Sequence, residues 1–241
     1  MTAGTLLHKS RIPLRKWFWA IYLVTQDKRG VSVWYLSEAL PLRYETAWFM
    51  LHKIRRAMTD RDDQFRLDGL VEMDGGYFGG IDHGRAGRGV ASAKVVIAVS
   101  VQGKGPRQRP TFAKMVVVPA MTKAAIASFT SAACAQTATI KSDGFSAYAV
   151  VRELGFDHQV VITKDQPEGA AAFPFVHTLI SNAKIWLGGT FHGGVSPAYL
   201  SAHLTEFCYR FNRRRWHREG FSRLLPSCIN HGPVPWADVT G

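Results

Sequence analysis

The amino-acid sequence predicts an α/β fold, in which a mixed sheet with flanking helices follows a small helical region. Three observations predict it. Apolar residues recur at helical spacing over residues 13–58, and dense β-branched runs then alternate with helical stretches up to residue 164. Helical spacing returns in the last third of the chain. The order β-β-β-α-β-α-β followed by helices is typical of a sheet covered by helices.

The composition indicates a packed, basic protein. The chain has 241 residues, of which 46% are hydrophobic and 20% charged, enough for one large domain or one medium domain with an appendage. Lys and Arg total 30 against 18 Asp and Glu, a formal net charge of +12. This balance favours a polyanionic partner, with nucleic acid first and an anionic membrane surface second.

The cysteine pattern and the apolar runs indicate an intracellular, cytoplasmic protein without a membrane partner. Cys134, Cys208 and Cys228 are scattered with no CxxC pair, so neither a disulfide framework nor a zinc ribbon is encoded. The longest apolar runs, such as VVIAVSV at 95–101, fall short of the about 20 residues that span a bilayer.

The first predicted region, residues 1–62, contains three short helices. A tight turn, PLR, separates the last two, and this arrangement resembles a helix-turn-helix. In that geometry the last helix meets the DNA major groove with its start and the phosphates further along. The residues expected to do so are Arg43, Tyr44, Thr46, Arg55 and Arg56. A plain helical bundle is the alternative interpretation.

A polar stretch, RDDQFRLDG at 61–69, is expected to link this region to the sheet-containing domain at 68–218. Five strands are predicted within LVEMD, AKVVIAVSVQ, FAKMVVVPA, TATIKSD and HQVVITK. The glycine-rich, basic stretch DHGRAGRGVASAK between the first two strands is expected to be an exposed loop that can touch a phosphate backbone.

A helix with a cationic end is predicted from Ser196, a candidate N-cap followed by Pro197. Its last residues, in FNRRRWHR, are expected to form a phosphate-binding stripe, for which a solvated helix end is the alternative. The stripe comprises Arg210, Arg213, Arg214, Arg215 and Arg218. Residues 219–241, with three prolines and little periodicity, are expected to form a C-terminal tail.

Two aspartates stand in or at the end of predicted strands, each directly before glycine. They are Asp74 in VEMDGG and Asp143 in IKSDG. A carboxylate there is costly to bury unless it is paired or binds a cation, and two on adjacent strands could bind Mg²⁺. The alternative is that each is an ordinary turn residue before glycine.

These motifs resemble those of bacterial insertion-sequence transposases of the DDE type. VEMDGGYFGG and IKSDGFSAY look like the first- and second-aspartate motifs, and HTLISNAKIWLGGTFHGGVSPAYLSAHLTEFCYRFNRRR is similar to the third-residue region of the ISXO-like branch, which carries Asp-Asp-Asn with a nearby Lys. KSRIPLRKWFWAIYL and ETAWFMLHKIRRAM resemble the helical region of that branch. The resemblance therefore extends over nearly the whole chain.

The resemblance implies an RNase H-like catalytic core and transposition chemistry. It implies that Asp74, Asp143 and Asn182 bind metal, Mg²⁺ or Mn²⁺, as two ions, and that Lys184 lies near the DNA. It also implies terminal inverted repeats and target DNA as partners, and at least a dimer on DNA. Members of the branch usually carry an acidic residue where this chain has Gly75, and usually begin with a zinc ribbon, which would end about where MTAGTLLHKS begins.

The third metal ligand has several candidates. On a helix over HTLISNAKIWL, Asn182 and Lys184 lie near the two edges of a polar arc, so Asn182 could face the metals while Lys184 neutralises a phosphate. Glu206, His177 and His192 are rival ligands, and the motif context favours Asn182 over them.

The leading hypothesis from the sequence is a metal-dependent DNA strand-transfer enzyme, associated with the bacterial nucleoid. An RNase H-like nuclease that cuts without joining is the second hypothesis. A transposase with a decayed catalytic core, acting only as a sequence-specific DNA-binding protein, is the third.

Overall fold

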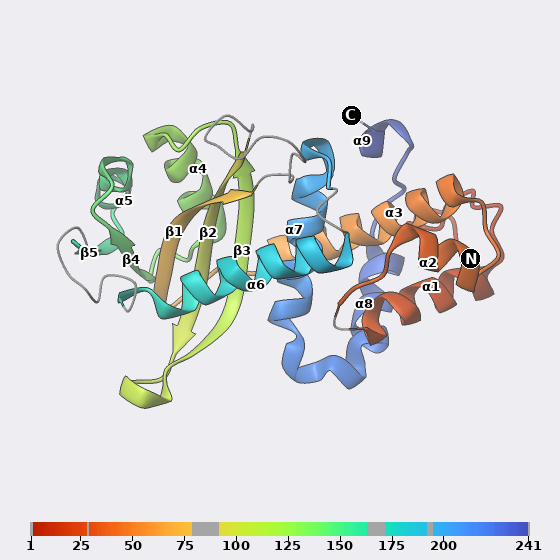
Figure 1. The fold of residues 1–241 in the computed structure, drawn as a ribbon, viewed down its shortest axis with the longest axis horizontal. Helices are drawn as coiled ribbons and strands as arrows, with labels where there is room; N and C mark the ends of the chain where they lie inside the picture. Colours follow the sequence, from red (N-terminus) through yellow and green to blue (C-terminus); the bar gives the residue numbers. More distant parts are fainter. Residues whose placement is uncertain (1, 28, 79–91, 163–171, 192–194, 241) are drawn as a thin grey trace.

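A computed structural model describes residues 2–27, 29–78, 92–162, 172–191 and 195–240 of the chain. The sheet lies at one end of the elongated molecule and a helical body at the other, with two long helices between them (Figure 1). The predicted basic loop between the first two strands falls almost entirely outside the described residues.

The sheet has five strands in the order β3-β2-β1-β4-β5. These are β1 (Leu70–Phe78), β2 (Ala93–Gln102), β3 (Arg109–Val118), β4 (Thr139–Asp143) and β5 (Asp157–Val161). The first three pair antiparallel, whereas β4 is parallel to both β1 and β5. The predicted α/β class, a mixed sheet with flanking helices consistent with an RNase H-like domain, is confirmed.

Both faces of the sheet are covered, which explains the uninterrupted apolar run of β2. Val96 and Ala98 face a core shared with α4 (Lys123–Ala133) and α5 (Val150–Glu153). Val95, Ile97 and Val99, which alternate with them along β2, face α6 and α7. A strand buried on both faces has no polar side to alternate with. Thr122 caps α4, because its side chain accepts the N–H of Ala125.

The long helices α6 (Pro174–Thr190) and α7 (Pro197–Asn212) connect the sheet to the helical body (Figure 1). Each begins with proline in its first turn, where no backbone N–H is needed. Helix α7 packs on β3 on one side and on α3 on the other. None of the helices in the described ranges is long and apolar enough to cross a membrane.

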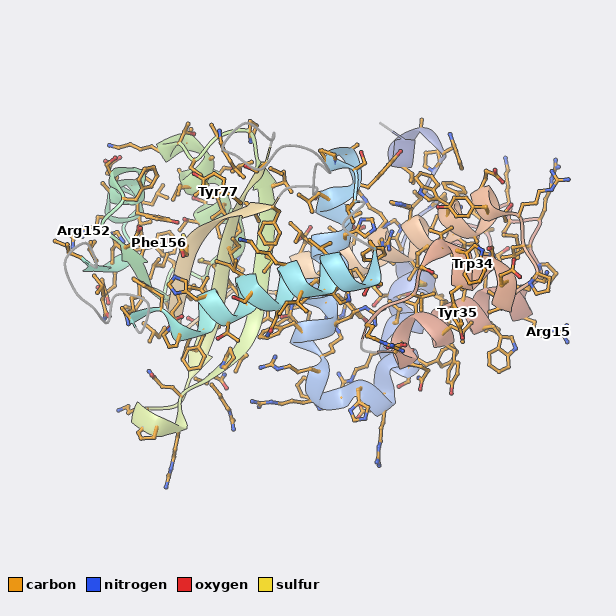
Figure 2. The ribbon with its side chains drawn as sticks, viewed as in Figure 1. Arg15, Trp34, Tyr35, Tyr77, Arg152 and Phe156 are labelled. Carbon is orange, nitrogen blue, oxygen red and sulfur yellow. The ribbon has the colours of Figure 1, made fainter. Side chains whose placement is uncertain are left out.

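The helical body contains α1 (Leu14–Gln26), α2 (Val33–Ala39) and α3 (Tyr44–Asp63) around one apolar core. Figure 2 shows Arg15 of α1 extending from the end of the molecule distant from the sheet. Trp34 and Tyr35 of α2 are exposed. The expected linker begins later than predicted, because α3 continues to Asp63 and buries Asp62 against α7.

The expected C-terminal tail is corrected by the structure, since it contains helix α8 (Gly220–Asn230) and the short α9 (Ala237–Thr240). Leu224 and Cys228 of α8 are buried in the core of the helical body. Pro226 lies inside this helix and interrupts the sequence signal that would have predicted it. The 3₁₀ turns are η1 (Gly105–Arg107), η2 (Ser146–Ala149) and η4 (Arg214–Glu219).

Candidate active site

Asp74 and Asp143 lie level with each other on adjoining parallel strands. The register pairs Glu72 of β1 with Lys141 of β4, and each aspartate follows two residues later. Met73, one residue before Asp74, and Ile140, three residues before Asp143, point into the core under α4. Because side chains alternate along a strand, both aspartates point to the opposite face, toward α6. The charge of Asp143 acts on Asp74, so the two carboxylates lie close together.

The side chain that meets this pair from α6 is His177. Its Nε2 lies 3.1 Å from Oδ2 of Asp74, within hydrogen-bond distance. The other carboxylate oxygen, Oδ1, accepts the backbone N–H of Gly75 at 2.7 Å. Burial raises the pKa of Asp74 and the negative charge of Asp143 raises it further, whereas Gly75 and His177 act in the opposite direction. The site therefore favours a positive charge between the aspartates.

The structure does not bring Asn182 to Asp74. Five residues along α6 turn Asn182 by about 140° from His177, whereas Lys184 returns to within about 20° of it. Asn182 lines a cavity of about 760 Å³ whose other walls include Trp186, Phe207 and Trp216. The side chain of α6 that contacts Asp74 is that of His177, one of the rivals of Asn182.

Lys184 lies on the same edge of α6 as His177. Its side chain is exposed, and Nζ lies 5.7 Å from the ring centroid of Phe78, four residues beyond Asp74 on β1. An ammonium at this position can contact a phosphate beside the aspartates. His192, another rival ligand, lies outside the described residues.

The donors of the site suit a hard divalent cation that also binds substrate. Within the described ranges, no three His, Cys, Asp or Glu side chains form a group that could hold a metal ion. Mg²⁺ is usually held by one or two carboxylates together with substrate phosphates. Asp74 and Asp143 provide two carboxylates of this kind, and His177 contacts Asp74.

Gly75, the departure from the usual acidic residue, faces away from this site. A Cβ at this position would lie 2.7 Å from Cε of Met121 and 4.0 Å from the hydroxyl of Tyr148, on the α4 side of the sheet. A side chain here would therefore displace Met121, and it would not point toward His177.

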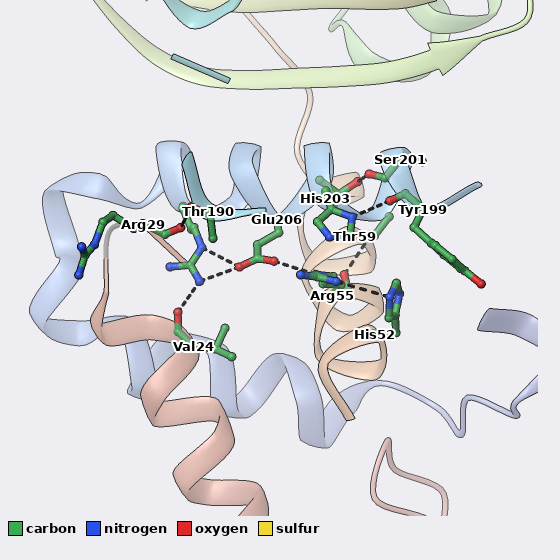
Figure 3. Close-up of polar contacts among 12 residues, drawn as sticks. Val24, Arg29, His52, Arg55, Thr59, Thr190, Tyr199, Ser201, His203 and Glu206 are labelled. Atoms are coloured by element: carbon green, nitrogen blue, oxygen red, sulfur yellow. Dashed lines mark hydrogen bonds and ion pairs between the residues drawn. The ribbon is translucent and has the colours of Figure 1, made fainter. Parts of the chain in front are cut away.

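Glu206, the remaining rival, is a buried structural carboxylate (Figure 3). Its Oε2 accepts the Nε–H of Arg55 at 2.7 Å, and its Oε1 accepts two N–H groups of Arg210 at 2.9 and 2.7 Å. Burial alone would raise its pKa, but the charges of Arg55 and Arg210 lower the pKa of Glu206 to about 2. This ion triad ties α3 to α7 and contributes nothing to the metal site.

The predicted DNA-contacting arginines divide into two groups. Arg55 and Arg210 pair with Glu206, and Arg213 binds Asp62 at 2.6 Å while stacking over Tyr209, so all three guanidinium groups already have partners within the protein. Arg55 is buried and the other two are largely covered, because acidic partners neutralise all three. Arg214 is exposed but donates to backbone carbonyls, including that of Phe211 at 2.7 Å.

The other predicted DNA contacts remain accessible. Arg43, Tyr44, Arg56 and Arg215 are exposed, whereas Thr46 is half-buried. Within the described ranges, Arg56 makes a long ion pair with Asp60, at 3.8 Å, and stays available to solvent.

Two residues near the site were missed by sequence reasoning. Tyr148 is buried, and burial together with the charges of Asp74 and Asp143 raises its pKa. Glu72 is buried and accepts two backbone N–H groups from the start of α6. The only sequence signal for Glu72 was its place two residues before Asp74, on the same face of the strand.

Comparison with known proteins gives two similarities. A family model described as the ISXO2-like transposase domain matches residues 66–212, from the residues just before β1 to the end of α7. An uncharacterized protein in the transposable element ISH50 of Halobacterium salinarum is 27% identical over 223 residues, covering 86% of this chain and 72% of that relative.

Proposed function

Because this chain belongs to the ISXO2-like transposase family, we propose that it catalyses metal-dependent cleavage and strand transfer of DNA at the ends of an insertion sequence. The observation that carries the proposal is the level placement of Asp74 and Asp143, with His177 3.1 Å from Asp74. We propose that Asp74 and Asp143 are the carboxylates that hold the cation, and that His177, not Asn182, is the residue of α6 that orients Asp74.

In this proposal Asp74 and Asp143 hold Mg²⁺ or Mn²⁺, as two ions, together with phosphate oxygens of the DNA. When bound, such ions activate a water or 3′-hydroxyl and stabilise the leaving oxygen of a phosphodiester. Lys184, on the same edge of α6, contacts the neighbouring phosphate, and His177 keeps Asp74 oriented toward the cation.

DNA binding is proposed to extend over the helical body. The start of α3, with Arg43 and Tyr44 exposed, supports a helix-turn-helix-like contact with terminal-repeat DNA, and Arg56 and Arg215 offer cations to phosphates. Pairing two ends and a target requires at least a dimer on DNA, and the expected location is the bacterial nucleoid.

A joining assay tests the proposed function against its two alternatives. Purified protein is incubated with labelled terminal-repeat DNA, a target plasmid and Mg²⁺ or Mn²⁺. Joined products are expected. Cleavage without joining would favour an RNase H-like nuclease, and a mobility shift with neither product would favour a transposase that retains only sequence-specific DNA binding.

The role proposed for His177 predicts different effects for two residues of α6. His177→Ala is expected to lower strand transfer by roughly 100-fold, because the side chain that orients Asp74 is lost. Asn182→Ala is expected to stay within a few-fold of wild type, because this side chain lines a cavity at the other edge of the helix. The two rates are measured in the joining assay at saturating Mn²⁺. The reverse order of effects would return the ligand role to Asn182.

The two groups of arginines predict a second contrast, between Arg215 and Arg213. Arg215→Ala is expected to reduce the slope of log affinity against log salt by about 1, because one phosphate contact is lost. Arg213→Ala is expected to leave that slope unchanged and to lower the melting temperature, because Asp62 loses its 2.6 Å partner. Fluorescence anisotropy and thermal unfolding measure the two effects. Equal salt slopes for the two variants would contradict the division.

A further inference from the structure

The start of helix α6 is attached to the sheet by two side chains. Oε2 of Glu72 accepts the backbone N–H groups of Phe175, at 3.0 Å, and Val176, at 2.9 Å. From the adjoining strand, Nζ of Lys141 donates to the carbonyl of Ala172 at 2.7 Å. Nζ of Lys141 also lies 5.3 Å from the ring centroid of Phe173, so it holds the chain just before the helix.

The backbone geometry explains why this attachment matters to α6. The first N–H groups of a helix have no partner within the helix, and no side chain of its own N-cap residue, Phe173, supplies one. Glu72, only 2% exposed, supplies the missing acceptor from a strand more than 100 residues earlier, and its charge favours the positive end of the helix dipole. The side chain that caps the start of α6 therefore comes from the sheet.

The same two strands carry the attachment and the candidate ligands. Glu72 of β1 and Lys141 of β4 are register partners. Asp74 lies two residues after Glu72, and Asp143 lies two residues after Lys141, all on the same face of the sheet. His177 comes directly after the capped residue Val176. A rigid connection therefore runs from the two strands through the first turn of α6 to the side chain that meets Asp74.

We propose that Glu72 and Lys141 are positioning residues that fix the rotation and height of α6, so that His177 and Lys184 face Asp74 and Asp143. The inference rests on the proposed function, since it assigns these residues to the geometry of that site. An error of about 1 Å in the placement of a reacting group can cost about 100-fold in rate. Neither Glu72 nor Lys141 needs to touch the DNA or the cation for this role.

The test compares Glu72→Ala with Glu72→Gln, because a single oxygen accepts both N–H groups. The glutamine carbonyl can keep both hydrogen bonds, whereas alanine leaves two buried donors without a partner. Glu153→Ala, which removes an exposed glutamate paired with Lys123, is the matched control. Lys141→Met tests the second attachment while keeping a long side chain.

Three quantities are measured on the full-length chain. Hydrogen exchange of the Phe175 and Val176 amides and Mn²⁺ affinity by electron paramagnetic resonance are read without DNA, and strand transfer is resolved into kcat and the KM for DNA. For Glu72→Ala we expect about 10-fold faster exchange at these amides, about 10-fold weaker Mn²⁺ binding and about 100-fold lower kcat, with KM changed by a few-fold. Glu72→Gln should recover all three to within a few-fold.

The outcomes separate the inference from the proposed function. Faster exchange in Glu72→Ala with unchanged Mn²⁺ affinity and kcat would reduce Glu72 to a helix cap and overturn the positioning role. If Glu72→Ala does not fold, Lys141→Met decides, and unchanged Mn²⁺ affinity and kcat in that variant would overturn the inference. A wild-type protein that binds Mn²⁺ but joins no DNA would contradict the proposed function alone, because exchange and Mn²⁺ binding are read without catalysis.

Discussion

Strand transfer is expected to fall by about 10³-fold or more when Asp143 is replaced by alanine, and end cleavage should fall in parallel. A cation at a phosphodiester contributes several kcal/mol of transition-state stabilisation, which corresponds to about this factor in rate. Asp74→Ala should have an effect of the same order, because the two carboxylates lie level on β1 and β4 and hold the same charge. DNA binding, measured by anisotropy in the absence of divalent cations, should stay within a few-fold of wild type.

The matched control is Asp157→Ala. Asp157 begins β5, the strand next to β4, and accepts a hydrogen bond from Oγ1 of Thr139 at 2.8 Å. It carries the same charge on a neighbouring strand but lies at the opposite end of β4 from Asp143, so strand transfer should be nearly unchanged. Activity of Asp143→Ala within 10-fold of wild type would remove the carboxylate pair from the centre of the chemistry.

The elements of this fold were predictable where the hydrophobic pattern had a single interpretation. The β-branched run around Val96 predicted a buried strand, and the stripe of Leu179, Ala183 and Trp186 predicted the buried face of a helix. Helix α8 was missed because Pro226 and a short apolar stripe hide it. The sequence also predicted a strand around Asp74 and another ending at Asp143, and the structure shows that these two strands are neighbours.

The third residue of the site could not be predicted in the same way. Helical spacing shows that Asn182 and Lys184 lie on opposite edges of α6, but it does not show which edge faces β1. That choice depends on the rotation of the helix against the sheet, and the contacts that fix it, from Glu72 and Lys141, join segments far apart in the sequence. Long-range contacts of this kind leave no periodic signal.

The cationic cluster shows the same limit for electrostatics. Counting arginines suggested a phosphate-binding stripe, but their number does not show whether acidic partners lie nearby in space. Glu206 meets Arg55 across 151 positions of sequence, and Asp62 meets Arg213 across a similar separation. A basic residue is therefore a candidate DNA contact only once its burial and partners are known.

Arg55→Ala is expected to lower the free energy of unfolding by about 3–5 kcal/mol, because it leaves Glu206 fully buried with half of its compensating charge removed. Urea denaturation at pH 7, followed by circular dichroism, measures this loss. Arg56→Ala is the matched control one residue away. Its side chain is 59% exposed and 3.8 Å from Asp60, so its removal should cost at most about 1 kcal/mol.

Acidification should weaken the same region in the wild-type protein. The folded-state pKa of Glu206, about 2, lies below its ordinary value of 4.5, so its stabilisation is complete above pH 4.5 and is lost as the pH falls toward 2. Burial also lowers the pKa of His52 to about 3 and that of His203 to about 4. Because the unfolded chain protonates these histidines first, stability should already fall below pH 6.5. Unfolding free energies that stay constant from pH 4.5 to pH 2, or an Arg55→Ala variant as stable as Arg56→Ala, would contradict the assignment of this triad as the clamp between α3 and α7.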